Sequence, residues 1–338
     1  MEASICTSST VSEVNSYAKD LSRYKDHFEK IDEELVSILS SRVDLIENIG
    51  GHTLSGHGKR LRPLFFVLSC QLCDYKGEGT HRLSTVFEYI HTASLLHDDV
   101  LDNAEVRRNK PSANRLWGNH AAVLVGDFLS SRSFSIALDS NSLPFLRTLI
   151  ETATTMAEGQ VLELVHTDDW NITKEEYMEV VTAKTAVLIS AACACGSIIS
   201  GTEVALEKSL ADFGLNAGIA FQLVDDLLDY ISSEEVLGKP VCKDVREGKI
   251  TLPLIYTLQE LEDSEKRRLE DLFKNQQATE EDYRDLIELV RSNGAVDRIQ
   301  YEAQSYSSRA ASCLSLFPDS AHKRNLLELN QYIIERRY

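Results

Sequence analysis

Residues that break helices are scarce in this chain. Only 16 glycines and 6 prolines occur among its 338 residues, and no stretch rich in them divides the sequence into separately folding halves. Few segments alternate apolar and polar residues as a half-buried strand requires, whereas apolar residues at helical spacing recur throughout. The sequence therefore predicts an all-α protein built as a single domain.

Positive charge is also in short supply. The chain has 35 Lys and Arg against 53 Asp and Glu, a formal net charge of −18. Such a surface repels phosphate backbones and anionic membranes, so we expect no nucleic-acid partner. No apolar run reaches the roughly 18 residues that a membrane-spanning helix needs, so we expect no stable membrane insertion either.

The seven cysteines are an odd number and form no recognisable disulfide framework. The N-terminus lacks a charged segment followed by an apolar core, the pattern of a signal peptide. We therefore expect reduced thiols and a cytoplasmic location. Cys70-x-x-Cys73 has metal or redox spacing, but both residues continue an apolar helical run, which favours buried core thiols.

Two copies of one acidic pattern, DDxxD, occupy residues 98–102 and 225–229. Each stands at the end of an apolar stretch with helical spacing, YIHTASLLHDDVLD and GIAFQLVDDLLD. The first and last aspartates of a motif lie about 40° apart on a helix, so both project from one face. If the two helix ends face each other, six carboxylates converge.

Such a cluster requires cations. Two like charges at ~4 Å repel by roughly 4 kcal/mol at an effective dielectric constant of 20. Mg²⁺ prefers hard oxygen ligands and typically bridges one or two carboxylates to substrate phosphates. The pair of motifs therefore predicts a Mg²⁺–phosphate site. A single acidic run is usually solvated surface, but both motifs emerge here from faces that should be buried, where unpaired charge is costly.

Two basic clusters could hold a second anion. Gly58-Lys59-Arg60-Leu61-Arg62 precedes a helix beginning near Pro63, whose N-terminus offers free N–H groups and a positive dipole end. Arg107-Arg108-Asn109-Lys110 directly follows the first acidic motif, and arginine can grip a phosphate with two parallel hydrogen bonds. The motifs and clusters together predict two diphosphate sites, one bound through Mg²⁺ and one bound directly by Lys and Arg. Between them we expect an apolar, helix-walled cavity.

Further polar residues fall on the expected helix faces of this site. His91 lies two helical turns before the first motif, and Gln222 lies three residues before the second, so each shares its motif's face. Lys184-Thr185 interrupts the apolar run VVTAKTAVLISAA, where a lysine must extend outward or meet an anion. Lys239 lies in the charged segment after the second motif.

The apolar spacing predicts a series of helices separated by polar or glycine-containing turns. They cover residues 21–49, 63–74, 80–103, 112–138, 143–166, 173–200, 204–231, 250–261 and 265–275, with more towards the C-terminus. Residues 1–20 are Ser/Thr-rich and weakly periodic, which predicts a flexible N-terminal arm before a catalytic domain over 21–338. Residues 50–58 predict a Gly/His-rich loop, and 232–249 a charged loop.

In this order, the motifs resemble those of the trans-isoprenyl diphosphate synthases, or polyprenyl synthetases, and look most like the long-chain, octaprenyl-type bacterial members. The resemblance covers residues 25–338. It is carried by the segments GKRLRP (58–63), IHTASLLHDDVLDNAEVRR (90–108), VLVGDFL (123–129), AKTAVLI (183–189), FQLVDDLLDY (221–230) and LGK…EGKITLPLIY (237–256). It implies an isoprenoid-synthase helical bundle around a central apolar cavity. The chain departs from the pattern of two glycines before the first lysine, because His57 precedes Gly58.

The resemblance also implies roles, residue by residue. The catalytic set would comprise Asp98, Asp99, Asp102, Asp225, Asp226, Asp229 and Lys184. The Mg²⁺ ligands would be Asp98, Asp102, Asp225 and Asp229, with three ions bound beside the allylic diphosphate. The contacts to the allylic diphosphate would be Arg107, Lys184, Thr185, Gln222 and Lys239. Isopentenyl diphosphate would be held by Lys59, Arg62, His91 and Arg108.

The implied reaction adds isopentenyl diphosphate repeatedly, head to tail, to an allylic primer such as farnesyl diphosphate. The allylic diphosphate leaves with its charge neutralised by Mg²⁺, and the double bond of isopentenyl diphosphate attacks the resulting carbocation. The released pyrophosphate takes up the proton, so no covalent enzyme intermediate is needed. Apolar walls exclude the water that would quench the cation.

Product length should depend on what blocks the cavity below the first motif. Ala93 and Ser94 stand five and four residues before Asp98, at positions that are bulky in short-chain, farnesyl-type relatives. Because both are small here, we expect the growing tail to pass and a medium-to-long product that serves as a quinone side chain. Phe134 and Phe87 are candidates for a deeper floor.

Several alternatives stay open. A short-chain farnesyl or geranylgeranyl diphosphate synthase is the alternative within the family. A ferritin-like di-iron protein would use Glu88-x-x-His91 and Glu163-x-x-His166, two ExxH patterns on expected helices, but it leaves both aspartate motifs unexplained. A class I terpene cyclase shares the first motif but usually has an Asn/Ser/Glu-type second one. The family also implies a homodimer, for which an amphipathic N-terminal helix would be a natural interface.

Overall fold

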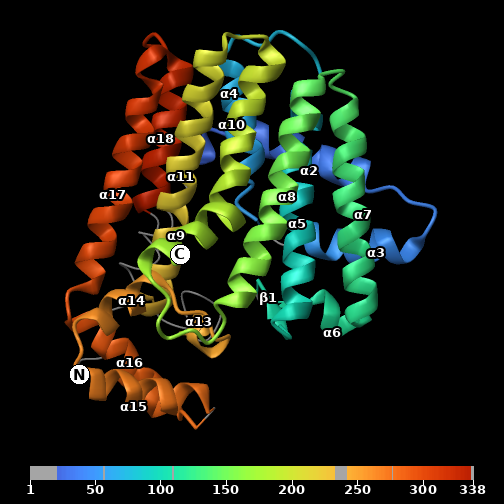
Figure 1. Cartoon of the computed structure of the whole chain (residues 1–338). Coiled ribbons are helices and arrows are strands. Elements are labelled where there is room, and N and C mark those ends of the chain that lie inside the picture. Colours follow the sequence, from blue (N-terminus) through green and yellow to red (C-terminus); the bar gives the residue numbers. More distant parts are fainter. Residues whose placement is uncertain (1–20, 56–57, 109, 233–241, 276, 336–338) are drawn as a thin grey trace, which may run out of the picture.

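The chain is helical almost throughout in its computed structural model, which describes residues 21–55, 58–108, 110–232, 242–275 and 277–335 (Figure 1). Within these ranges the only strands are β1 (Val106–Arg107) and β2 (Lys110–Pro111), which pair antiparallel. The predicted all-α fold class is therefore confirmed. The N-terminal arm expected over residues 1–20 lies outside the described residues.

The helices follow one another along the chain with short connections. They are α2 (Lys25–Ile38), α3 (Asp44–Leu54), α4 (Leu61–Leu72), α5 (Thr80–Leu101), α6 (Ala113–Trp117), α7 (Asn119–Leu138), α8 (Leu143–Val165), α9 (Lys174–Val181), a π-helical turn (Thr182–Ala186), α10 (Val187–Ser200), α11 (Val204–Ile231), α13 (Lys243–Arg246), α14 (Leu252–Gln259), α15 (Asp263–Lys274), α16 (Glu280–Ser292), α17 (Ala295–Cys313), a 3₁₀ turn (Leu314–Leu316) and α18 (Ala321–Glu335).

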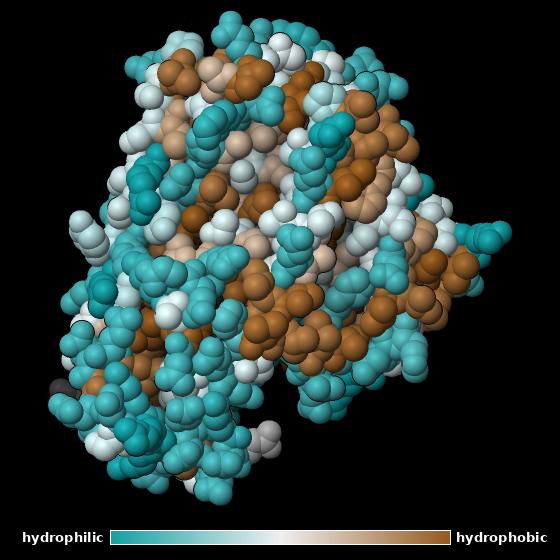
Figure 2. Space-filling model, in the orientation of Figure 1, coloured by the Kyte–Doolittle hydropathy of each residue, from teal (hydrophilic) through white to brown (hydrophobic). Residues whose placement is uncertain are grey.

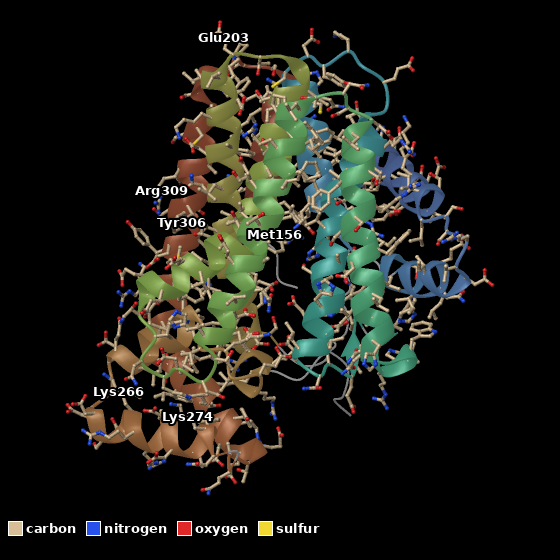
Figure 3. The ribbon with its side chains drawn as sticks, turned by 45° about the vertical axis from the view of Figure 1, so that its right-hand side comes forward. Met156, Glu203, Lys266, Lys274, Tyr306 and Arg309 are labelled. Atoms are coloured by element: carbon tan, nitrogen blue, oxygen red, sulfur yellow. The ribbon has the colours of Figure 1, made fainter. Side chains whose placement is uncertain are left out.

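The long helices stand side by side, and the two motif helices end at the same end of the molecule (Figure 1). Helix α5 packs against α4 and α7, whereas α10 packs against α4, α8 and α11, and α11 also packs against α17. The C-terminal ends of α5 and α11 both reach the lower end of the view, near α6 and α13. Helix α15 lies beyond this end, with Lys266 and Lys274 on it (Figure 3).

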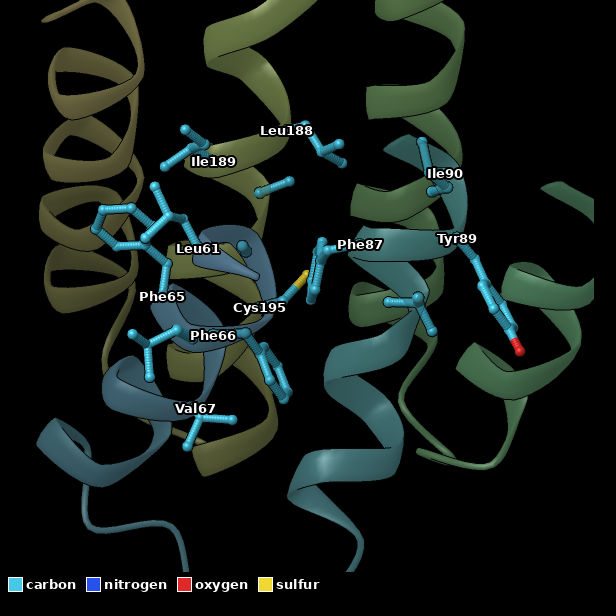
Figure 4. Packing of buried hydrophobic residues seen from close by; sticks show 14 of the residues in the cluster. Leu61, Phe65, Phe66, Val67, Phe87, Tyr89, Ile90, Leu188, Ile189 and Cys195 are labelled. Carbon is cyan, nitrogen blue, oxygen red and sulfur yellow. The ribbon is translucent and has the colours of Figure 1, made fainter. Parts of the chain in front are cut away.

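The main core surrounds α10, whose sequence is apolar on every side. A helix of that kind is stable only when it is buried on all faces. Leu188, Ile189, Cys193 and Cys195 are all at most 1% exposed. They lie close to the aromatic side chains of α4, such as Phe66 (Figure 4). Each fully buried Leu, Ile or Phe contributes roughly 1.5–3 kcal/mol of transfer free energy.

A second apolar cluster supports the lower end of α11. Trp170 and Tyr177 from the α8–α9 region pack there with Leu227 of α11, Tyr256 of α14 and Val290 of α16. All five side chains are at most 7% exposed. This cluster fixes the position of the second acidic motif relative to α9, α14 and α16.

The helix predicted over 21–49 is divided in two, which the apolar spacing did not indicate. Helix α2 ends at Ile38, α3 begins at Asp44, and α3 continues to Leu54 through part of the predicted Gly/His-rich loop. The Ser41 hydroxyl accepts a hydrogen bond from the Val43 amide at 3.2 Å. Local bonds of this kind give the backbone an alternative to the helix, so the apolar period continues while the helix does not.

Three further predicted segments differ in detail. The helix predicted over 112–138 is interrupted at Gly118, whose φ of 84° ends α6 before α7 begins. The helix predicted over 173–200 contains the π turn Thr182–Ala186. The segment predicted as a charged loop over 232–249 holds the short helix α13, whereas its residues 233–241 lie outside the described part of the chain.

Two helices meet the length and mean hydropathy of a membrane span, although the sequence contains no run of 18 apolar residues. They are Asn119–Leu138 and the continuous helix Lys174–Ser200, with 39% and 56% of their most apolar windows buried. A core helix of a globular protein meets the same criteria, and Lys174–Ser200 includes the central α10. The finding is therefore weak evidence for a membrane span.

Candidate active site

Both acidic motifs line one cavity. Asp98 and Asp102 at the end of α5 and Asp225 and Asp226 near the end of α11 form part of the wall of a cavity of about 220 Å³. The two motifs are 127 positions apart in the sequence, and the parallel arrangement of α5 and α11 brings them together. The facing carboxylates expected from the sequence are therefore present in the structure.

The aspartates that face the cavity meet lysines. The Asp98 carboxylate lies 3.7 Å from Lys184 Nζ, and Asp102 Oδ2 accepts a hydrogen bond from Lys249 Nζ at 2.8 Å. Burial raises the pKa of Asp98, against the opposing effect of Lys184. Asp98 Oδ1 is fully buried and has no hydrogen bond from any described residue, which leaves it available to a cation. The Asp225 side chain is exposed and lines the cavity from α11.

The middle aspartates are turned into the protein. Asp99 is 2% exposed and accepts hydrogen bonds from Arg107 Nε at 2.8 Å and Nη2 at 2.5 Å. Asp226 is 5% exposed and accepts from Tyr177 Oη at 2.5 Å and Gln222 Nε2 at 2.6 Å. Burial raises the pKa of Asp226 to about 7, although both hydrogen bonds favour its ionised form. Asp99 therefore fixes the side chain of Arg107, and Asp226 fixes those of Tyr177 and Gln222.

Asp229, the last aspartate of the second motif, is buried and does not face the cavity. It is 1% exposed, is absent from the cavity wall, and accepts a hydrogen bond from the Asp244 amide at 3.0 Å. Its carboxylate therefore ties the end of α11 to α13. The resemblance implies that Asp229 binds Mg²⁺; in the conformation described, Asp244 lines the cavity instead.

Lysines and carboxylates alternate around the cavity. Lys184 Nζ donates to Glu163, and Lys249 Nζ donates to Glu247 Oε2 at 2.9 Å as well as to Asp102. Lys243 Nζ lies 2.7 Å from Glu247 Oε1. Burial opposes the charge on Lys249, but the surrounding carboxylates outweigh it and raise the pKa of Lys249. Among the described residues, the wall has seven carboxylates and four Lys or Arg side chains. This excess of negative charge favours the entry of cations.

The position of Lys184 depends on two glycines in the neighbouring helices. A Cβ at Gly159 of α8 would lie 2.7 Å from the Lys184 amide nitrogen, and one at Gly218 of α11 would lie 2.7 Å from Ala186 Cα. The π turn thus sits against both helix backbones. Single π turns inside α-helices are frequent at functional sites.

A second, cation-rich cluster lies beside the first motif. A Cβ at Gly58 would lie 2.9 Å from Arg108 Nη1, so the segment before α4 rests against the loop after α5. Burial lowers the pKa of His91 well below its ordinary value, and the charges of Arg62, Arg108, Arg107 and Arg60 lower it further. The structure therefore brings Arg62, His91 and Arg108 together, as expected, and His91 is neutral at pH 7. Lys59 is in the same segment.

The remaining predicted site residues fall in two groups. Thr185 and Gln222 line the cavity with the aspartates, whereas Lys239 lies outside the described residues. Ala93 is 2% exposed, and the Ser94 hydroxyl donates to the His91 carbonyl oxygen at 2.8 Å. These two small side chains occupy the turn of α5 just below the motif.

Phe87, a predicted floor of the product cavity, lies in a cluster of aromatic rings. Phe87 of α5 packs against Phe66 of α4 and Phe145 of α8, with ring centroids 5.3 and 6.3 Å away. All three rings are 0% exposed, and Phe134 is a partly buried neighbour of the same core. Phe87 is 11 residues before Asp98, or about 16 Å along the helix axis.

Several cavity residues had no role assigned from the sequence. They are Glu163, Tyr177, Lys243, Asp244, Glu247 and Lys249. Lys249 lies in the segment 237–256 that carries the family resemblance, which was a usable signal. Glu163 was noticed only as half of an ExxH pattern. Tyr177 had no signal, because its contact with Asp226 spans 49 residues.

The donor set fits a metal that is shared with a ligand. Among the described residues, no group of three or more His, Cys, Asp or Glu side chains could hold a metal ion unaided. Mg²⁺ usually takes one or two carboxylates and completes its shell with water and phosphate oxygens. The carboxylates of Asp98, Asp102 and Asp225 suit that role. The di-iron alternative has no support, because Glu163 and His166 line this cavity whereas Glu88 and His91 do not.

Comparison with known proteins gives a consistent set of relatives. The family model described as polyprenyl synthetase matches residues 43–290. The octaprenyl diphosphate synthase of Escherichia coli (strain K12) is 37% identical over 298 residues, which cover 88% of this chain and 92% of the relative. A solved polyprenyl synthase from Caulobacter crescentus CB15, complexed with calcium and isoprenyl diphosphate, has a TM-score of 0.91 and 36% identity and covers 95% of this chain and 98% of its own. A decaprenyl diphosphate synthase from Rhodobacter capsulatus has a TM-score of 0.88 and 32% identity, covering 95% and 99%.

Proposed function

We propose that this chain, which belongs to the polyprenyl synthetase family, builds a long all-trans polyprenyl diphosphate by adding isopentenyl diphosphate repeatedly to an allylic diphosphate. The single observation that carries this proposal is the pair of acidic helix ends on one cavity, with a cation-rich cluster beside it. A product of this kind is a precursor of quinone side chains.

The acidic cavity suits an allylic diphosphate with bound Mg²⁺. Asp98 and Asp102 on one side and Asp225 on the other would hold the ions. Asp229 and Asp244, whose main-chain to side-chain hydrogen bond joins α11 to α13, would be further ligands. We propose three ions, as the family resemblance implies. When bound, Mg²⁺ supplies positive charge at the oxygen of the departing diphosphate.

Protein cations complete the grip on the leaving diphosphate. Carboxylates hold Lys184 and Lys249 at the cavity wall. Each ammonium group could exchange its carboxylate partner for an oxygen of the bound diphosphate. We assign Thr185, Gln222 and Arg107 to the same diphosphate, together with Lys239 from the segment outside the described residues. Donors fixed in advance stabilise developing charge without reorganising during the reaction.

The cation-rich cluster suits the diphosphate of isopentenyl diphosphate. Lys59, Arg62 and Arg108 supply formal charge without a metal, and the neutral imidazole of His91 supplies a hydrogen bond. The two substrates would then lie on either side of the end of α5, with their reacting carbons between the diphosphates.

In each cycle the bond between C1 of the allylic chain and its diphosphate oxygen breaks, and the electron pair leaves with the diphosphate. The double bond of isopentenyl diphosphate forms the new carbon–carbon bond to C1, and the resulting cation loses a proton to the released pyrophosphate. The apolar residues below the motifs exclude water from the cation. No side chain forms a covalent bond in this scheme.

The small residues below the motif suit a long product. Ala93 and Ser94 would obstruct a growing tail less than bulky side chains would, and the ring cluster around Phe87 would be reached only after further elongation. We assign Phe134 to the same lower region. The tail has to part the packed aromatic side chains as it lengthens, which makes Phe87 the candidate for the final stop.

A second copy of the chain would cover an exposed apolar face on α7 and α8. Leu143, Ile150, Val161 and Leu164 recur at spacings that place them on one side of α8, each at least 46% exposed. Apolar surface is plain on this side of the molecule (Figure 2). This face, rather than an N-terminal helix, is our proposed homodimer interface. Light scattering should then report about twice the chain mass of 37.9 kDa.

We propose a cytoplasmic location, in line with the six described cysteines, none of which is in a disulfide.

The direct test of function is incubation with Mg²⁺, labelled isopentenyl diphosphate and farnesyl diphosphate, followed by sizing of the products. The proposal requires a ladder that ends in a long polyprenyl chain. Mainly farnesyl or geranylgeranyl diphosphate would identify a short-chain synthase instead.

A further inference from the structure

Arg60 is the middle basic residue of the segment 59–62, yet its side chain turns into the protein and is only 8% exposed. Its Nε donates to Asp32 Oδ1 at 2.9 Å, and its Nη1 donates to Glu88 Oε1 at 2.7 Å. Its Nη2 donates to the carbonyl oxygen of Leu54. All three guanidinium nitrogens are therefore engaged by the protein itself, which leaves this residue unsuited to hold a substrate phosphate.

The backbone at Arg60 is also unusual. Its φ of 47° and ψ of 32° place it in the left-handed region, which non-glycine residues seldom occupy and which persists only when the surroundings hold it. Arg60 caps the N-terminus of α4, so this conformation sets how the chain enters that helix. Lys59 and Arg62 lie on either side of the bend. Their positions therefore depend on the bonds that keep Arg60 in place.

Glu88 lies on α5, three residues before His91, and its side chain is 3% exposed. Burial opposes the charge on Arg60, but Glu88 and Asp32 outweigh it and raise the pKa of Arg60. The charge of Glu88 also favours the charged form of Arg108, whereas Arg60 disfavours it. Glu88 is thus a buried counter-charge between the segment before α4 and the loop after α5. It offsets the repulsion between the guanidinium groups of Arg60 and Arg108.

We propose that Arg60 and Glu88 form a clamp that touches no substrate but positions Lys59 and Arg62 for the diphosphate of isopentenyl diphosphate. The clamp joins the start of α4 to the middle of α5, and Asp32 extends it to α2. Arg60 and Glu88 are positioning residues in this account. The inference rests on the proposed function, since it concerns the second diphosphate site of that reaction.

The test is steady-state kinetics of Glu88→Gln and Arg60→Lys with each substrate varied in turn. Each variant should raise KM for isopentenyl diphosphate about tenfold, while KM for farnesyl diphosphate and kcat at saturation stay within about twofold. Glu302→Gln is the matched control. The Glu302 carboxylate accepts from Lys174 Nζ at 2.8 Å and from Tyr256 Oη, in a partly buried pair away from both diphosphate sites. It should leave both KM values unchanged.

A double variant, Arg60→Met with Glu88→Leu, separates positioning from stability. Removing both charges avoids a buried unpaired charge, so this variant should fold even if a single variant does not. A pair that only stabilises the fold would give normal KM values in the double variant. A clamp predicts that KM for isopentenyl diphosphate stays raised. The inference is wrong if the single variants match Glu302→Gln, or if the double variant recovers; failure of the wild-type chain to use isopentenyl diphosphate would instead reject the proposed function.

Discussion

At the level of single residues, the six motif aspartates are not equivalent. Asp98, Asp102, Asp225 and Asp226 line the cavity, but the middle aspartates, Asp99 and Asp226, accept hydrogen bonds from buried or half-buried protein side chains. The i, i+4 spacing was enough to place the outer residues of the first motif on one face. The inward role of the middle residues depends on Arg107 and Tyr177, whose contacts arise only when the chain has folded.

The residue that most directly tests the course of the growing tail is Ser94, one helical turn below Asp98. We expect Ser94→Phe to shorten the main product by several isoprene units, because a phenyl ring there would obstruct the proposed path of the tail below the motif. The first condensation should continue at a rate within about tenfold of the wild type, since both diphosphate sites are untouched. Product chromatography measures both effects.

The matched control is Ser94→Ala, which keeps the position small and loses only the hydroxyl's bond to the His91 carbonyl oxygen. It should leave product length unchanged. An unshortened ladder from Ser94→Phe would mean that the tail takes another route through the bundle.

At the level of elements, apolar spacing located most long helices but missed their interruptions. The ranges expected for α5, α8 and α11 agree with the structure to within a few residues. The breaks at Ser41 and Gly118 and the π turn at Thr182–Ala186 were not predicted, because the apolar period continues through each of them. The π turn is stabilised by close approach of two other helices, and a local pattern contains no information about such neighbours.

That close approach gives a prediction for Gly159. A Cβ there would lie 2.7 Å from the Lys184 amide nitrogen and 2.8 Å from the Ala183 carbonyl carbon, and backbone atoms cannot move aside as a flexible side chain can. Gly159→Ala should therefore displace the π turn and lower kcat about 10- to 100-fold by misplacing Lys184. Measurement of kcat together with the thermal midpoint checks this expectation.

Gly51→Ala is the control for this change. Gly51 is also helical, and a Cβ at that position would meet no atom within 4 Å. It should leave kcat unchanged and slightly raise the stability of α3. If Gly159→Ala behaved like Gly51→Ala, the π turn would have no part in positioning Lys184.

At the level of the whole molecule, composition and apolar spacing together predicted the all-α single domain, since helix breakers and strand patterns were both scarce. The convergence of the two motifs was expected because the same acidic pattern ends two apolar helical stretches. The pairing of Lys249 with Asp102 could not be predicted, because 147 residues separate them and only the packed bundle brings them together.

The packing of α2 and α4 against α5 includes a histidine pair that should make stability depend on pH. His27 Nδ1 and His81 Nε2 are 3.0 Å apart, and Gln71 Nε2 lies 3.2 Å from His27 Nε2. Burial, with the charges of His27 and Lys30, lowers the pKa of His81 to about 4 from its ordinary 6.5. Between these pH values the His81 imidazole is protonated in the unfolded chain but not in the folded one. The free energy of unfolding therefore falls as pH drops from 6.5 towards 4.

Urea denaturation at pH 7.5 and pH 5 measures this effect. Since other groups also titrate, the informative quantity is the difference between the wild type and His81→Gln, whose side chain is neutral at both values. The wild type should lose more stability on acidification than the variant does. Equal losses would show that His81 takes no part in acid destabilisation.

The central claim is that one diphosphate is held through Mg²⁺ by the aspartates and the other directly by protein cations. Calorimetric titration with an unreactive thio analogue of farnesyl diphosphate, and separately with isopentenyl diphosphate, tests it most directly. The account predicts that the allylic analogue binds only with Mg²⁺ and loses that binding in Asp98→Ala and Asp225→Ala, whereas isopentenyl diphosphate also binds in EDTA. Equal binding of the allylic analogue with and without Mg²⁺ would contradict it.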